Sequence, residues 1–405
     1  MSLGWIDFSK TERSKVLTVL DMLTQDGTLD ELGIAPVRDG FSNLFFPGTS
    51  TIQTRAKYFF VVPYALKDLE YSSETVPGKM LVSLDAMERR CGEKFLSLNV
   101  GEEGVIGKRS LVSGGWVKRT PADIYWAGLR RYGIFIGGSL SLSEYIRALC
   151  TQKNQKSALK SLGNRRDDAE ENEADDLDAG SGGRIQFWHM PLYRKDWFDT
   201  LSIGLTEAEG RFLKEQIIMS CPDSMLGFIL EHEMHEILDI DSYQHLEGII
   251  GKFPEQMQED YQLALAFSDF IFVVRAVYND ILSEGENVEA RDLLEMKKPR
   301  FAEIADIDMD YVLRRLQIFH NPMLLRFLQS AKAAMQDGDM EGLKKIIRDR
   351  EVFLKGQSRA KTAHPGEFDR QKWMGGKELD YRFRTAQTII RDIFESEGRA
   401  HAESE

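Results

Sequence analysis

Cysteines and long apolar runs are both scarce in this sequence. Among its 405 residues only Cys91, Cys150 and Cys221 are cysteines, and they make no C-x-x-C pair. This excludes a disulfide framework and a zinc knuckle, and it favours a reducing cytoplasm as the location. The most apolar stretch, LALAFSDFIFVVRAVYNDIL, is interrupted by Asp269 and Arg275. A membrane helix needs roughly 18 uninterrupted apolar residues, so this stretch predicts a core helix and no membrane contact.

Familiar catalytic and nucleotide-binding motifs are missing too. No G-x-G-x-x-G follows a strand pattern, and no G-x-S-x-G occurs. The stretch GEEGVIGKRS is not a P-loop, because Gly101 and Gly107 are one residue too far apart and Arg109 replaces the Ser or Thr that holds magnesium. His232 and His235 are three residues apart rather than the four of a zincin, so we expect no metal site. No cofactor is expected, and whether the protein is an enzyme stays open.

The composition is that of a folded protein with more than one domain. Hydrophobic residues make up 42% and charged residues 29%, which is enough apolar surface for sizeable cores. The first residues, MSLGWIDFSKTERSK, lack the pattern of a signal peptide. The net charge of −13 excludes a protein that coats nucleic acid through bulk charge, but it allows a local basic face.

Helix-start signals predict a mainly α fold. A Ser or Thr followed three residues later by an acid or Gln occurs at Ser9, Thr28, Ser50, Ser141 and Thr206. Proline in the first helical position follows Thr120 and Asn321. Further helices are expected near residues 255–284, 290–304, 310–318, 322–335, 340–353 and 380–395. We expect a helical bundle and a smaller amino-terminal helical domain with a short β-hairpin at residues 104–119, turning at Ser113-Gly114-Gly115.

An acidic segment divides the chain. Eight acids lie between Asp167 and Asp178 and are followed by a Gly/Ser run, with almost nothing apolar to bury. This composition predicts a disordered linker or loop at 153–183. We therefore expect an amino-terminal domain at 1–152, with a candidate helix-turn-helix and wing, a carboxy-terminal helical domain at 184–397, and a disordered tail at 398–405.

The stretch FFPGTSTIQTRAKYFFVVPYAL, residues 45–66, is a candidate anion site. A capping box of Ser50 and Gln53 explains its turn. It leaves four polar side chains unexplained at the start of a helix that is otherwise apolar: Thr51, Thr54, Arg55 and Lys57. The amides of a helix start and an arginine together bind phosphate or carboxylate, which would suit an enzyme with a phosphorylated substrate. Alternatively, Arg55 pairs with an acid of the protein itself.

A second arginine lies within the predicted core helix near residues 255–284. Ser268, Arg275 and Asn279 are spaced so that they share one face of it. A buried arginine must be paired or must line a cavity, so Arg275 either packs within the protein or contributes to the anion site.

Two basic stretches favour contact with nucleic acid. The helices predicted between residues 121 and 150, which follow Arg119, interleave arginines with aromatic residues: Arg130, Arg131, Arg147, Tyr125, Trp126 and Tyr132. Residues 341–392 contain thirteen Lys and Arg against eight acids, and they include Arg359, Lys361, Arg382 and Arg384 beside aromatic residues. Such mixtures suit phosphates and base stacking. The alternatives are plain helix packing for the first stretch, and a solvated face or an internal partner of the acidic segment for the second.

Four stretches carry a resemblance to a known family: LGWIDFS, FPGTSTIQTRAKYFFVVPYAL, RTPADIYWAGLRRYGI and LDYRFRTAQ. Together they resemble a bacterial family described only as a domain of unknown function, over nearly the whole chain. The gene neighbourhoods of that family imply a role in anti-phage defence, beside phospholipase-D-like nucleases and helicases. The resemblance implies no activity, catalytic residue or cofactor.

Three functions are therefore left open. The first is an accessory protein of an anti-phage defence system that acts on DNA or RNA, or beside a nuclease or helicase partner. The second is an enzyme with an anion site at the start of the Ser50 helix. The third is a structural scaffold.

Overall fold

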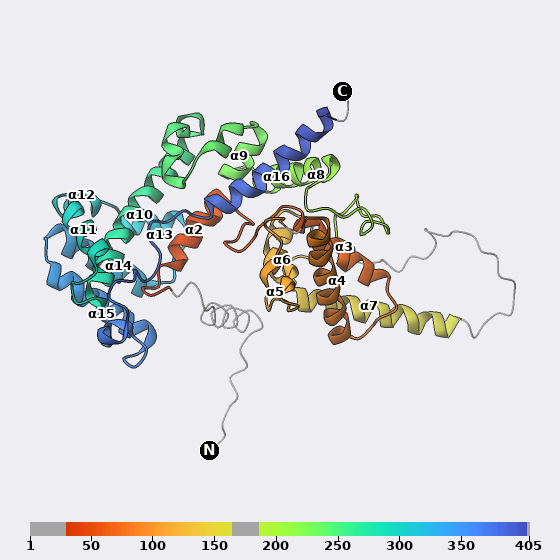
Figure 1. Cartoon of the computed structure of the whole chain (residues 1–405), viewed down its shortest axis with the longest axis horizontal. Helices are drawn as coiled ribbons and strands as arrows, with labels where there is room; N and C mark the ends of the chain where they lie inside the picture. Colours follow the sequence, from red (N-terminus) through yellow and green to blue (C-terminus); the bar gives the residue numbers. More distant parts are fainter. Residues whose placement is uncertain (1–29, 100, 164–185, 403–405) are drawn as a thin grey trace, which may run out of the picture. The chain divides into compact units, whose positions relative to one another are not determined.

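The computed structural model describes residues 30–99, 101–163 and 186–402. Within these ranges every regular element is helical, apart from an isolated bridge between Phe135 and Trp188, so the mainly α prediction is confirmed. The chain forms two compact units, each made of two stretches (Figure 1). Unit 1 combines the residues up to Phe41 with Ile250–Tyr381, and unit 2 combines Ser42–Ile249 with the chain from Arg382 onward. Helix α2 (Ala35–Phe45) begins in unit 1 and ends in unit 2.

Unit 1 is built around one long helix. It contains α10 (Glu255–Leu282), α11 (Val288–Lys297), α12 (Phe301–Ile304), α13 (Met309–Arg315), α14 (Pro322–Gln336) and α15 (Met340–Lys355). Because α10 is apolar around most of its circumference, it is buried where α11, α12 and α15 pack against it. Helix α14 in turn packs against α12, α13 and α15.

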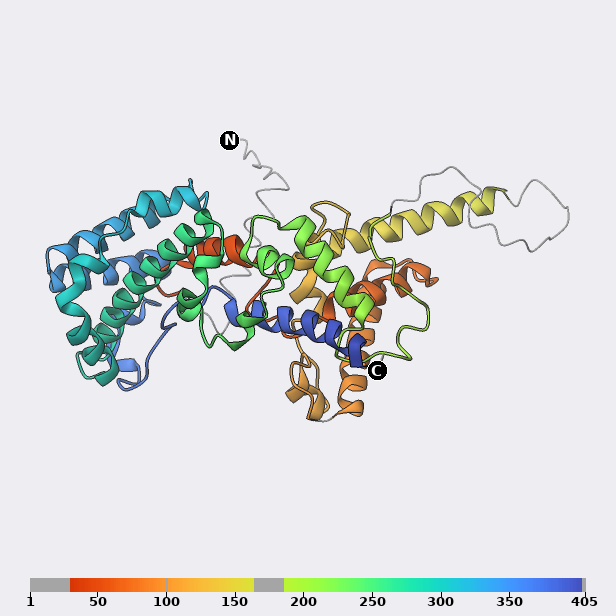
Figure 2. The same ribbon diagram turned by 90° about the horizontal axis from the view of Figure 1, so that it is seen from above.

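Unit 2 is built around α3. It contains α3 (Tyr58–Tyr71), α4 (Pro77–Leu98), α5 (Lys108–Val112), α6 (Pro121–Arg131), α7 (Leu142–Gly163), α8 (Glu207–Ser220), α9 (Met225–Glu231) and α16 (Phe383–Ala402). Helix α3 buries all its residues from Tyr58 to Leu66 and packs against α4 and α6. Helix α16 lies along α8 in both views (Figures 1 and 2), where a Cβ on Gly210 would collide with the Ser396 side chain.

Short 3-10 helices complete both units. They span His235–Asp239, Tyr243–Gly248, Ile250–Lys252, Lys298–Arg300, Lys361–Ala363 and Pro365–Glu367.

Four predicted helix starts are confirmed, at Thr120, Ser141, Thr206 and Asn321. In each case the side-chain oxygen accepts a hydrogen bond from the backbone N–H three residues later. These signals work because both partners lie within one turn of the chain. The predicted starts at Ser9 and Thr28 lie outside the described residues.

The predicted helix start at Ser50 is wrong. Helix α3 begins at Tyr58, and residues 46–57, called the turn segment below, are irregular. The Gln53 side chain accepts a hydrogen bond from the Ser50 N–H at 3.1 Å and donates one to the Gly48 carbonyl at 3.1 Å. It therefore closes a turn instead of capping a helix.

The predicted β-hairpin at residues 104–119 is also wrong. This stretch forms α5 between two turns. Leu111 packs so closely on Gly92 of α4 that a Cβ there would lie 2.8 Å from it. The Trp116 indole N–H donates to Asp85 of the same helix at 2.8 Å. Leu111 and Trp116 of this stretch therefore contact α4.

Some boundaries differ from those expected. Helix α7 extends to Gly163, into the predicted linker, while residues 164–185 lie outside the described ranges. Helix α16 extends to Ala402, past the expected domain end at 397. Residues 132–141 separate α6 from α7, where a helix-turn-helix has a turn of about three or four residues. The domain bounds inferred from composition stay a prediction.

Glu88 of α4 is a carboxyl group buried inside unit 2, with 1% of its surface exposed. Its Oε1 accepts the N–H of Ala122, in the first turn of α6, at 2.6 Å. No described residue hydrogen-bonds its Oε2. Because burial penalises the charged form, the pKa of Glu88 rises to about 8.

We predict that Glu88 makes the protein less stable as the pH rises. The unfolded chain loses this proton near pH 4.5 and the folded protein near pH 8, so between these values the folded state holds more protons. The free energy of unfolding should fall by about 1.4 kcal/mol per pH unit from this group. Glu88→Gln stays neutral and should remove that part of the slope in urea unfolding measured from pH 5 to pH 8.

Glu93→Gln, an exposed substitution on the same helix, is the matched control and should keep the wild-type slope. Identical slopes in wild type and Glu88→Gln would contradict the assignment.

Candidate functional site

Arg55 is bound by two carboxylates of its own protein. Its Nε donates to Asp392 of α16 at 2.9 Å, and its NH1 donates to Glu102 at 3.1 Å. Asp392 also accepts the N–H of Ala56 at 2.7 Å. The arginine and the amide expected to hold an anion are thus both present, and the Asp392 side chain occupies the place of that anion. An external anion would have to displace it.

The other residues of the predicted anion site have separate surroundings. Lys57 is buried, and its Nζ donates to both oxygens of Glu209, at 2.9 and 2.7 Å. The Thr54 hydroxyl donates to the Gly104 carbonyl at 2.6 Å. Thr51 is exposed, and no hydrogen bond joins its side chain to a described residue. These three side chains do not converge.

The polar face expected on α10 holds an extended segment of unit 1, residues 373–381. Ser268 bonds to the backbone of Leu379, Arg275 to that of Lys377, and Asn279 to that of Met374. Burial lowers the pKa of Arg275 to about 10, and its NH1 donates to a carbonyl at 2.6 Å. The face predicted from the spacing therefore has a packing role within unit 1.

Several cations of residues 341–392 are paired inside unit 1. Lys361 donates to Glu31 at 2.6 Å, and Lys355 contacts the same carboxylate. Burial lowers the pKa of Lys355 to about 8. Other ion pairs join Arg370 to Glu284 and Glu286, Lys377 to Glu289, and Lys344 to Asp280.

The remaining predicted cations of that stretch differ in exposure. Arg382 donates to the Asn43 side chain at 2.9 Å and to the Thr49 carbonyl at 2.8 Å, within unit 2. Arg359 of unit 1 is exposed and donates to a backbone carbonyl. Arg384 is exposed on α16.

A different stretch, residues 104–160, also carries exposed positive charge and has fewer acids, and it is called the cationic segment. Seven of its cations are exposed and form no ion pair with a described residue: Arg109, Lys118, Arg119, Arg130, Arg131, Arg147 and Lys156. Its two acids, Asp123 and Glu144, are engaged at the starts of α6 and α7. The charge of this segment is therefore available to a partner.

A local charge count along the sequence could have found this segment. Residues 104–160 contain ten Lys and Arg and two acids, a stronger excess than that of residues 341–392. Arg130, Arg131 and Arg147 were predicted as side chains of a helix-turn-helix, and Arg119 as a separate candidate for anion or nucleic-acid binding, rather than all four as part of one basic stretch.

The aromatic residues between residues 121 and 150 that were expected to stack on bases are buried, whereas Phe353 of the second basic stretch is exposed. Tyr125, Trp126 and Tyr132 are at most 7% exposed. The Tyr125 hydroxyl accepts the N–H groups of Thr54 and Arg55 at 2.9 and 3.2 Å. What the cationic segment presents to solvent is charge and not ring surface.

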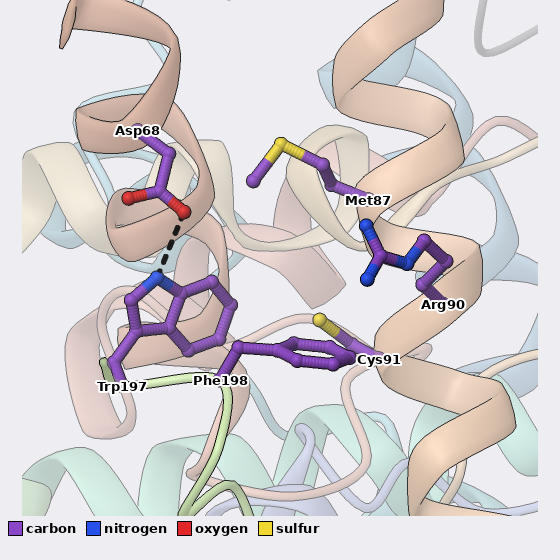
Figure 3. Close-up of a pocket in the computed structure, with 6 residues that line it drawn as sticks. All are labelled: Asp68, Met87, Arg90, Cys91, Trp197 and Phe198. Carbon is purple, nitrogen blue, oxygen red and sulfur yellow. Dashed lines mark hydrogen bonds between the residues drawn. The ribbon is translucent and has the colours of Figure 1, made fainter. Parts of the chain in front are cut away.

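Unit 2 also contains a small pocket between α3, α4 and the chain that precedes α8 (Figure 3). Its volume is about 120 Å³, and its lining comprises Asp68, Met87, Arg90, Cys91, Trp197 and Phe198. Burial, with the nearby charge of Glu88, raises the pKa of Cys91 to about 12, so the thiol is protonated at neutral pH and is a poor nucleophile.

Two further findings concern the described residues alone. Within them, no cluster of three or more His, Cys, Asp or Glu side chains could hold a metal ion. No helix in these ranges has the length and apolarity needed to cross a membrane.

The comparisons with known proteins reach only part of the chain. Residues 1–156 match the model of a family of unknown function, DUF6361. No curated protein and no solved structure matches the sequence. The matched range contains the turn segment and nearly all of the cationic segment, whereas α8, α9 and α16 lie outside it. The family carries no assigned activity.

We predict that Asp392→Ala creates an anion site at Arg55 and the N–H of Ala56. The Ala56 N–H loses its acceptor and Arg55 keeps only Glu102, in a largely buried place, so the free energy of unfolding should fall by about 2–4 kcal/mol. Acetate or formate should restore part of this loss, and neither should change the wild type. Thermal unfolding across an acetate series at constant ionic strength measures the effect.

Glu102→Ala is the control, because the side chain of Glu102 is 23% exposed and that of Asp392 only 5%. It should cost about 1 kcal/mol or less and show no rescue. An Asp392→Ala variant that is insensitive to acetate would contradict this role of Asp392.

Proposed function

We propose that the protein binds the phosphate backbone of nucleic acid through the cationic segment. The observation that carries this proposal is the set of seven exposed cations without an ion pair, in a stretch that contains only two acids and in a chain whose net charge is −13. A stretch with this excess of exposed positive charge is suited to a polyanion.

The burial pattern of α6 supports this proposal. Its exposed positions are Asp123, Ala127, Arg130 and Arg131, a spacing that lies along one side of a helix. Arg119 precedes the helix, so cations lie at both ends of that side. Eleven residues of helix rise about 16 Å, roughly the rise of five base pairs at 3.4 Å each.

The chemistry of the segment favours phosphates over bases. Arginine binds phosphate with two parallel hydrogen bonds, while the nearby aromatic rings are buried. We therefore expect binding that depends strongly on salt and weakly on sequence.

Fluorescence anisotropy with two duplexes of unrelated sequence, a single strand and an RNA tests the proposal. Affinity for both duplexes should fall with salt, with a log–log slope of up to about −6 for seven phosphate contacts. The double variant Arg130→Gln/Arg131→Gln should reduce the size of that slope by about 2 and weaken binding at least about tenfold at low salt.

The matched control is Lys345→Gln/Arg348→Gln, which removes two exposed cations from α15 in unit 1. It should bind within about twofold of the wild type. No binding at low salt, or equal losses in both double variants, would overturn the proposal.

We further propose, on the sequence resemblance, that this binding serves anti-phage defence in a bacterial cytoplasm, beside a nuclease or helicase partner. In the native host, the wild-type gene should lower phage plaque counts relative to a deletion. Arg130→Gln/Arg131→Gln should lose that protection and the α15 control should keep it. Tagged protein should co-purify with a nuclease or helicase encoded nearby. Unchanged plaque counts on deletion would refute the defence role.

A further inference from the structure

The pocket of unit 2 has opposite charges on its two sides. Asp68 enters from α3 and Arg90 from α4, and the space between them is bordered by Met87, Trp197 and Phe198 (Figure 3). A site with one charge of each sign selects ligands differently from the cationic segment, which has one sign only.

Asp68 is held rigidly but keeps spare acceptor capacity. Its Oδ1 accepts the Tyr193 hydroxyl at 2.5 Å, and its Oδ2 accepts the Trp197 indole N–H at 2.9 Å. An ionised carboxylate offers about four lone-pair positions, so two donors leave room for a third. An ammonium group is the donor that compensates the charge as well.

Arg90 is positioned without being neutralised. Its guanidinium carbon lies 5.0 Å from the centre of the Phe198 ring. No described residue forms an ion pair or hydrogen bond with its side chain, which is exposed. A planar guanidinium held over a ring keeps its N–H edges available for a carboxylate.

Phe198 also contacts a second cation of α4, Lys94. The Lys94 ammonium donates to the backbone carbonyls of Phe198 and Asp199 and lies 4.7 Å from the centre of the Phe198 ring. The surface under Arg90 is therefore preorganised, which lowers the entropy lost on binding.

The size and the remaining lining restrict the ligand further. A cavity of 150 Å³ takes the six carbon atoms of benzene, so about 120 Å³ limits the enclosed ligand to about six non-hydrogen atoms at most. Met87, Cys91 and Trp197 offer sulfur and aromatic surface, which suits a short apolar group.

We propose that this pocket binds a small free α-amino acid of the size of L-alanine. Its ammonium group lies at Asp68, its carboxylate at Arg90, and its methyl group against the sulfur and indole surface. A simple anion is repelled by Asp68 and a simple cation by Arg90, so only a zwitterion gains from both charges. This proposal is independent of nucleic-acid binding.

Isothermal titration calorimetry of the full chain tests it with four probes at millimolar concentration: L-alanine, propionate, ethylamine and L-leucine. L-alanine should bind one to one. Propionate and ethylamine, which each lack one charge, should bind at least about tenfold more weakly, as should L-leucine, which is too large for the pocket.

Arg90→Gln should weaken L-alanine binding about tenfold without changing the thermal stability of the free protein. Arg89→Gln is the matched control: Arg89 is the neighbouring residue, it pairs with Glu93, and it does not line the pocket. No heat of binding for L-alanine, propionate as tight as L-alanine, or equal losses in both variants would overturn the proposal.

Discussion

The backbone N–H groups of the irregular turn segment need hydrogen-bond acceptors from other parts of unit 2. A buried amide without an acceptor costs about 1–3 kcal/mol, and residues 46–57 have no helix to provide one. The Tyr125 hydroxyl serves Thr54 and Arg55, while Asp392 serves Ala56 and the Arg55 side chain. These contacts fix helices α6 and α16 to the start of α3. The positive charge of Arg55 is paired within the protein and is not available to an external anion.

Buried charged side chains are paired or hydrogen-bonded within unit 1 as well. In unit 1, the Arg350 guanidinium donates to the backbone carbonyls of Leu32, Met323 and Gly33, and Lys355 and Lys361 surround Glu31. Buried charges of this kind are tolerated because each is paired or hydrogen-bonded. The cationic segment of unit 2 differs from these pairs, because it leaves seven cations to the solvent and contains only two acids. Whether a basic stretch can bind a partner thus depends on its pairing, which a count of charges does not reveal.

Helix starts that depend on residues close in the sequence were mostly predicted correctly, whereas contacts between residues far apart in the sequence were not predicted. The starts at Thr120, Ser141, Thr206 and Asn321 and the long helix near residues 255–284 follow from interactions within a few residues, so the sequence was sufficient for them. Ser50 and Gln53 match the sequence pattern of a capping box. The Gln53 side chain also donates to the Gly48 carbonyl, which closes a turn, and the pattern does not take this bond into account. The two acids that pair with Arg55, Glu102 and Asp392, lie 47 and 337 residues further along the chain, and no local pattern could identify them. The spacing of Ser268, Arg275 and Asn279 gave the correct face of α10 but not the segment bound to it.

The pairing of α8 with α16 has a consequence for the order of events during synthesis. The ribosome makes α8 well before α16, and the whole of Ile250–Tyr381, which belongs to unit 1, comes between them. Until α16 emerges, the side of α8 at Gly210 is uncovered and the N–H of Ala56 lacks its acceptor. Unit 2 is therefore completed after the second stretch of unit 1 has been translated, and a chaperone that shields nascent apolar surface would act on α8 during that interval.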